Sequence, residues 1–207
     1  MQPIEHNELW HAEATLFVAI LLQLTISKHL QLGPHYLVVA LLTLLVIAVA
    51  FTAPRRHVGR AAPHITLATL LIALVSIANA GELALLTKAL INGSQTPGRS
   101  LLSGALAIFL TNIIVFALWY WELDSPGLTG RRQRSKDDFQ FPQQQEHNSW
   151  QPTFFDYLYV SITNSTAFSP TDTMPLTHPA KALMSAQALI ALLTVVLVTA
   201  RAVNILG

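Results

Sequence analysis

Hydroxyl and amide side chains crowd residues 156–172, which read DYLYVSITNSTAFSPTD. The first half of this stretch places apolar residues on one face of a helix, and the second half contains Pro170, which has no amide donor and cannot continue a helix. The stretch is too short and too polar to cross a bilayer, but the segment that follows it can cross one. This order is typical of a re-entrant loop, which dips into the membrane and returns.

The residues that end this stretch are the candidate lining of a path through the membrane. Non-helical backbone at membrane depth is tolerated only where protein buries it or where it faces water. The segment must therefore face either an aqueous path or a subunit interface. Its residues are Thr166, Ala167, Phe168, Ser169, Pro170, Thr171 and Asp172.

Other polar residues fall inside or beside apolar segments. Glu82 is an acid in an apolar segment, which by default suggests a function, but Lys88 is two turns away and we favour an interfacial Glu82 paired with it. Asn79 and Asn112 are expected to hydrogen-bond between helices as structural contacts.

Two acids follow an aromatic cluster at residues 119–121, which is typical of a membrane–water interface. We expect Glu122 and Asp124 to lie in headgroup water. Alternatively, they form an acidic vestibule if the polar segment after them folds over a pore.

Several classes of function are disfavoured. The chain has no cysteine, so it has no disulfide framework, thiolate metal site or cysteine nucleophile. His6 and His11 are five residues apart rather than the four of a helical metal pair, and no metal site or cofactor is expected. No catalytic triad or phosphate-binding loop has usable context, so we do not expect an enzyme. A net charge of +1 gives no argument for nucleic acid.

The composition indicates an integral membrane protein in contact with a lipid bilayer. Only 11% of the residues are charged, against about 25% in soluble domains, and the mean hydropathy is +0.47. The N-terminus has no lysine or arginine before the first apolar segment, so no signal peptide is expected there. We expect an all-α polytopic fold with about five spans, at residues 12–30, 36–53, 64–90, 101–121 and 179–206.

The order of these segments predicts two parts. Residues 1–100 would hold three N-terminal spans, and residues 101–207 would form a pore-like module. Its expected elements are an outer helix at 101–121, a polar loop at 122–152, a pore helix at 153–166, a filter-like hairpin at 167–178 and an inner helix at 179–206. Phe139 and Phe141 could partly order the polar loop.

From Asp156 onward the chain resembles the pore region of two-helix potassium channels, whose pattern is D-x-L-Y-x-S-x-x-T-x-T-T-V-G-Y-G-D followed by a proline and G-K. The matching residues are Asp156, Leu158, Tyr159, Ser161, Thr166, Asp172, Pro175 and the pair Ala180-Lys181. The resemblance implies a pore loop that conducts monovalent cations, assembled as a homotetramer. The layout also resembles an uncharacterised family of bacterial inner-membrane proteins, which implies location but no activity.

The chain departs from that pattern in the filter itself. Ala167 replaces the threonine whose hydroxyl coordinates the innermost ion, and Ser169 and Thr171 replace both glycines. A ring of backbone carbonyls needs conformations that glycine adopts cheaply and β-branched residues do not. Altered or lost potassium selectivity follows from these departures. The alternative is a non-conducting membrane protein with a structural or partner-binding role.

The orientation implied by the resemblance conflicts with the charge pattern. If the hairpin enters from outside, as in potassium channels, five spans place two arginine clusters outside as well. Lysine and arginine favour the cytoplasmic side, so their distribution favours a hairpin that enters from the cytoplasm. The two clusters are Arg55, Arg56 and Arg60, and Arg131, Arg132 and Arg134.

Overall fold

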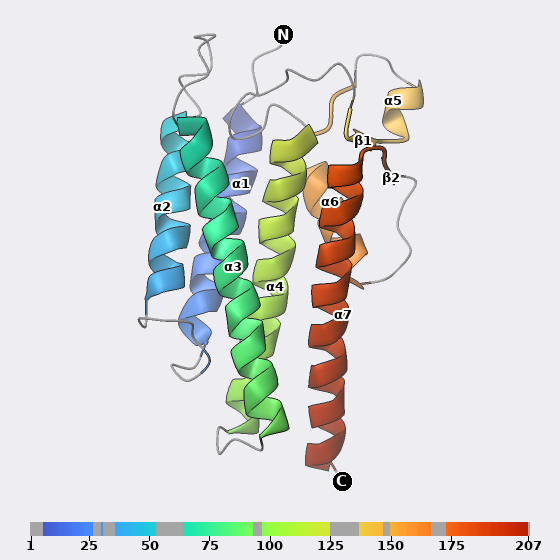
Figure 1. Cartoon of the computed structure of the whole chain (residues 1–207). Coiled ribbons are helices and arrows are strands. Elements are labelled where there is room, and N and C mark those ends of the chain that lie inside the picture. The colour runs from blue at the N-terminus through green and yellow to red at the C-terminus, as the bar shows by residue number, and fades with distance from the viewer. Residues whose placement is uncertain are drawn as a thin grey trace.

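The computed structural model describes residues 6–26, 30, 36–52, 64–92, 97–124, 137–146, 150–166 and 173–206. Most of these residues are helical, which confirms the predicted all-α class. Long helices run side by side along one direction, and a shorter helix, α6, lies beside α7 (Figure 1). The small elements β1, β2 and α5 gather at one end of the bundle, opposite the C-terminus.

Helices α1, α2, α3 and α4 alternate in direction along the chain, whereas α6 and α7 both run from the end that holds β1 and β2 toward the other end (Figure 1). The helices are α1 (His6–Thr25), α2 (Leu37–Thr52), α3 (His64–Ile91), α4 (Gly98–Asp124), α5 (Gln143–Glu146), α6 (Phe154–Thr166) and α7 (His178–Leu206). Two short strands, β1 (Phe139–Gln140) and β2 (Met174–Pro175), pair antiparallel. Prolines mark some of the boundaries: the Pro97 carbonyl accepts bonds from the amides of Ser100 and Leu101 as α4 begins.

Among the residues that the structure describes, three helical segments are long and apolar enough to cross a membrane: Thr69–Ile91, Gly98–Asp124 and His178–Ala200. They support a membrane-embedded protein. Trp10–Thr25 and Leu37–Ala48 are apolar but shorter, so the predicted count of five spans is not confirmed.

Helix α4 is the centre of the bundle. It packs against α1, α3, α6 and α7, and 72% of its spanning segment is buried. Only 17% of the α7 segment is buried, so most of the α7 surface is open to lipid or to other protein. The close packing extends to Gly104, where an added Cβ would lie 2.9 Å from Cδ1 of the buried Leu30.

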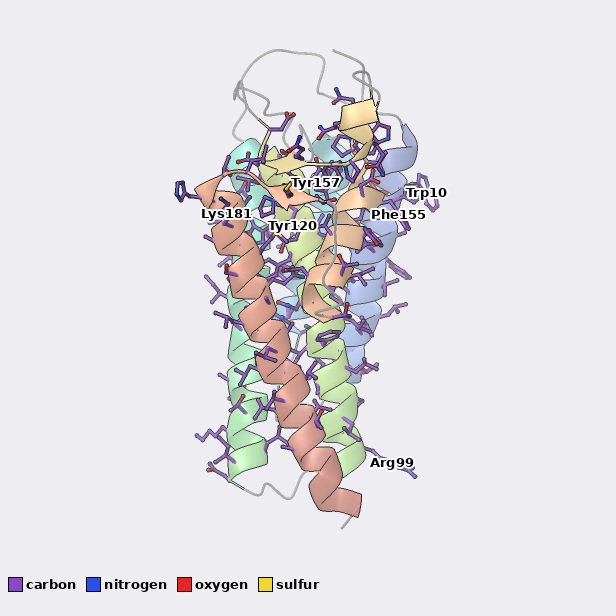
Figure 2. All side chains as sticks on the ribbon, turned by 90° about the vertical axis from the view of Figure 1, so that its right-hand side faces the viewer. Trp10, Arg99, Tyr120, Phe155, Tyr157 and Lys181 are labelled. Atoms are coloured by element: carbon purple, nitrogen blue, oxygen red, sulfur yellow. The ribbon has the colours of Figure 1, made fainter. Side chains whose placement is uncertain are left out.

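Aromatic and charged residues mark the two ends of the apolar region. Trp10, Phe155 and Lys181 lie toward the end that holds β1 and β2, and Arg99 lies toward the other end (Figure 2). On α4, Arg99 and Trp119 are about 30 Å apart at the usual rise of an α-helix. This separation matches the hydrocarbon thickness of a bilayer.

Candidate functional site

Helix α6 is about half as long as the helices that flank it. It starts at the end of the bundle that holds β1, runs inward beside α4 and α7, and ends at Thr166 (Figure 1). The next described element, β2, lies back at the starting end. The sequence predicted a helix at 153–166, and α6 occupies 154–166. The chain therefore enters the bundle and returns at the same end.

The first turn of α6 is fixed by a reciprocal cap. The Asp156 carboxylate accepts hydrogen bonds from the Thr153 amide at 2.7 Å and from the Thr153 hydroxyl at 2.8 Å. The Asp156 amide donates to the Thr153 carbonyl at 3.1 Å. A threonine followed three residues later by an acid is a common helix start, because it satisfies amides that the helix leaves without partners.

The two faces of α6 differ sharply. One face is buried and carries Phe154, Tyr157, Ser161 and Ser165, which recur every three or four residues. The other face, which we name the outer stripe, is exposed and consists of Phe155, Tyr159, Ile162 and Thr166. In Figure 2, Tyr157 lies among the helices and Phe155 points away from them. One face of α6 is thus packed within the helix bundle, and the other face is exposed.

A buried cluster of hydrogen bonds joins α6 to both neighbouring helices. We name it the Gln187 network; its members are Tyr120, Ser161, Asn164, Ser165 and Gln187. The Gln187 Nε2 donates to the hydroxyls of Ser161 and Ser165 at 2.6 and 2.8 Å. The Gln187 Oε1 accepts from the Asn164 Nδ2 at 2.9 Å and from the Tyr120 hydroxyl.

Backbone carbonyls complete this network. The Ser161 hydroxyl donates to the Ile113 carbonyl on α4 at 2.6 Å, and the Asn164 Nδ2 donates to the Met184 carbonyl on α7 at 2.9 Å. The hydroxyls of Ser161 and Ser165 thus face protein rather than an open path. Sequence reasoning missed Gln187 and Tyr120. The available signal was an amide side chain in the middle of an apolar segment.

Asp124 holds the upper part of α6 against the end of α4. Its Oδ2 accepts from the Tyr157 hydroxyl at 2.7 Å. Its Oδ1 accepts from the backbone amides of Phe139, at 3.0 Å, and Asp138. The expectation that Asp124 lies in headgroup water is wrong, because the side chain is 8% exposed and protein donors occupy both oxygens.

The ordered part of the polar loop clamps the start of α7. Residues 139 and 140 of β1 face Pro175 and Met174 of β2, and the Leu176 amide donates to the Asp138 carbonyl at 2.8 Å. The Thr177 hydroxyl donates to the Asp138 carboxylate and accepts from the Ala180 amide at 3.4 Å. Because Asp138 also bonds to Asp124, one short segment links the end of α4 to the beginning of α7.

Aromatic rings fill the space beneath this clamp. Phe139 and Phe141 are buried, as the sequence suggested they could be. The Phe139 ring lies 5.3 Å from that of Tyr120, and the Phe141 ring lies 5.4 Å from that of Tyr157, measured between centroids. Such pairs add to the stabilisation from burial alone. Asp138, Phe139 and Phe141 of the predicted solvent loop are therefore buried.

Of the predicted lining residues, the structure describes Thr166. It is exposed at the end of α6, and its hydroxyl bonds to the Ile162 carbonyl at 3.0 Å. The other predicted lining residues lie outside the described part of the chain; they are Ala167, Phe168, Ser169, Pro170, Thr171 and Asp172. Glu122 is half-buried at the end of α4.

The predicted pairing of Glu82 with Lys88 is wrong. Glu82 is fully buried and accepts a hydrogen bond from the Gln23 Nε2 at 3.0 Å, whereas Lys88 is exposed. Six residues along a helix amount to about 9 Å and place the two side chains on different faces. Asn79 and Asn112 are buried, and one polar atom of each, the Asn79 Oδ1 and the Asn112 Nδ2, has no hydrogen-bond partner.

Comparison with protein-family models, curated proteins and solved structures found no match to this chain. The resemblance to a potassium-channel pore region therefore rests on the spacing of the matching residues from Asp156 to Lys181. The function it implies is argued below as a proposal.

Proposed function

We propose that residues 101–207 form a pore-loop module and that several copies of the chain surround a conduit for monovalent cations in the bacterial inner membrane. One observation carries the proposal: α6 is a half-length helix between α4 and α7, and the elements before and after it lie at one end of the bundle. A helix that ends inside a bilayer leaves backbone carbonyls that must face water or protein. A conduit at the end of α6 meets this requirement.

The exposed surfaces support assembly around α6 and α7. One copy supplies one hairpin, so a closed conduit needs several copies about a symmetry axis, and the channel resemblance favours four. The outer stripe of α6 is exposed, and α7 carries the exposed small side chains of Ser185 and Ala186 beside the buried Gln187. Small residues allow close approach of helices in a membrane.

The expected conduction is cationic and weakly selective. Asp172 would supply a negative charge at the mouth, and hydroxyls would supply neutral oxygen ligands. Without the two glycines, a strict ring of four carbonyl layers is disfavoured, so potassium is not expected to be strongly preferred over sodium. In this proposal α1 and α2 are also membrane spans, which gives five in all.

Positive charge sets the proposed orientation. Eight of the twelve lysines and arginines belong to segments that join helices at the end where α6 begins, or to the first turn of α7. They are Arg55, Arg56, Arg60, Arg131, Arg132, Arg134, Lys136 and Lys181. The hairpin would then enter from the cytoplasm. A membrane-impermeant thiol reagent should label Leu176→Cys only in inside-out vesicles and Arg99→Cys only in right-side-out vesicles; the reverse pattern contradicts this orientation.

Ion flux and cross-linking together test the pore. Because the chain has no cysteine, single cysteines report cleanly on neighbours. We expect Ala186→Cys on α7 to form covalent dimers under oxidation in native membranes. Purified protein in liposomes should pass potassium and sodium, and Phe168→Ala should change that flux. Native mass measurement in mild detergent should give a tetramer.

A matched position provides the control. Ile77 on α3 is 65% exposed but lies outside the pore-like module, so Ile77→Cys should not form dimers under the same conditions. Equal cross-linking at both positions would indicate random collision. A monomer that passes no ions, with Phe168→Ala equally silent, overturns conduction and leaves the non-conducting alternative. The hydroxyls of Ser161 and Ser165, which face their own bundle, favour that alternative.

A further inference from the structure

Glu82 is an acid buried in an apolar seam between helices. It lies on the face of α3 that also carries Val75, Ala78 and Leu86, and its side chain is 0% exposed. The Gln23 amide on α1 donates to one carboxylate oxygen, Oε2, at 3.0 Å. The other oxygen, Oε1, is buried without a hydrogen-bond partner. An ionised carboxylate in this setting carries a large desolvation cost that one amide does not offset.

A second buried acceptor without a donor lies one turn away. Asn79 precedes Glu82 by three residues, so the two side chains occupy the same face of α3. Asn79 is 2% exposed, and its Oδ1 also has no partner. These two oxygens lie on neighbouring side chains, and both can only accept. One hydrogen atom placed between them would satisfy both. A proton on the Glu82 Oε1 converts that atom into a donor and leaves Oε2 as the acceptor for Gln23.

We propose that Glu82 is a proton-binding site, which holds one proton on Oε1 and shares it with the Oδ1 of Asn79. The site lies between α1 and α3, outside the pore-like module. It does not depend on the proposed conduction.

No cation among the described residues compensates the carboxylate. Lys88 on the same helix is about 9 Å farther along and faces another direction. Helix α2 has no ionisable side chain. Among the described side chains of the other long helices, the ionisable groups are His11 and Glu13 on α1, Arg99, Tyr120, Glu122 and Asp124 on α4, Asp156, Tyr157 and Tyr159 on α6, and His178 and Lys181 on α7. Binding of a proton neutralises the Glu82 carboxylate without the coordination shell that a metal ion requires.

The protonation state of Glu82 links the packing of α1 against α3 to pH. When the proton is present, Gln23, Glu82 and Asn79 form one continuous chain of hydrogen bonds from α1 to α3. When it is lost, an unpaired charge lies at that seam, and separation of the helices or entry of water is favoured. The protein therefore takes up one proton when α1 packs against α3.

The pH dependence of unfolding tests this site. The folded state would bind the proton more tightly than the unfolded state, so stability is fully present at low pH and falls as pH rises. Above the ordinary titration range of glutamate, the unfolding equilibrium constant of the natural chain in detergent should rise by up to about tenfold per pH unit. Glu82→Gln mimics the protonated acid and should show no such rise.

Controls separate this site from general effects of charge. Glu13→Gln, on the half-exposed side of α1, should retain the pH dependence of the natural chain. In infrared difference spectra, the natural chain should show the carbonyl stretch of a protonated carboxylic acid, and Glu82→Gln should lack it. Equal pH profiles for the natural chain and Glu82→Gln, with no such band, overturn the proposal. So does stabilisation by sodium or potassium over choline at fixed pH that Glu82→Gln abolishes, which would indicate a metal cation at Glu82 instead.

Discussion

Replacing Gln187 with leucine should lower the free energy of unfolding by about 3 kcal/mol, because four neighbouring side chains, three of them buried, each lose a hydrogen bond at once. The side chain is 0% exposed and bonds to Tyr120, Ser161, Asn164 and Ser165. Leucine has nearly the same size, so loss of packing contributes little. Denaturant titration in mixed micelles measures the loss, and hydrogen exchange should accelerate in α6 more than in α3.

The control for this substitution lies two residues farther along α7. Leu189 is 67% exposed, and Leu189→Ala should change stability by less than about 0.5 kcal/mol. Individual hydrogen bonds in membrane proteins contribute about 0.6 kcal/mol on average, so a large effect requires that the network act as a unit. If Gln187→Leu costs no more than the control, the network does not hold α6.

Asp124→Asn should be the second strongly destabilising change, with a cost of about 3 kcal/mol. An amide offers one acceptor oxygen where the carboxylate offers two, and its NH2 group would face donors from Tyr157 or from the backbone of Phe139 and Asp138. The cost should appear in thermal unfolding. Limited proteolysis near Phe139 should also become faster, because that segment loses its attachment to α4.

A pair of tyrosines in α6 separates this hydrogen bond from general effects on the helix. Tyr157→Phe removes only the bond to Asp124 and should cost about 1 kcal/mol. Tyr159 is 56% exposed, and Tyr159→Phe should leave stability unchanged. Adding Tyr157→Phe to Asp124→Asn should cost less than the sum of the two single changes. Strict additivity would show that the two side chains act independently.

The helices were predictable because their signals are local. The apolar runs, Pro97 and the Thr153–Asp156 cap each depend on residues within one or two turns. The short α6 was predictable for the same reason, since polar residues and prolines end its apolar pattern. The predicted count of five spans is not confirmed, because the described apolar segments of α1 and α2 are shorter than those of α3, α4 and α7.

The partners of the polar residues were not predictable, because they are set by contacts between distant segments. Asp124 follows an aromatic belt, which in sequence favours water, yet it meets Phe139 and Tyr157. Glu82 meets Gln23, which is 59 positions away, rather than the nearby Lys88. Sequence rules pair such a residue with the nearest opposite charge along the chain. In the fold, its partner is instead the nearest hydrogen-bond donor in space.

The Gln187 network also has a consequence for the order of synthesis. Ser161 and Ser165 leave the ribosome before Gln187, so α6 reaches the membrane before its main partner exists. Until α7 inserts, the buried face of α6 has unsatisfied hydroxyls, and residence at the membrane surface is less costly than insertion. Helix α7 thus supplies the hydrogen-bond partners that the buried face of α6 lacks when α6 is synthesised.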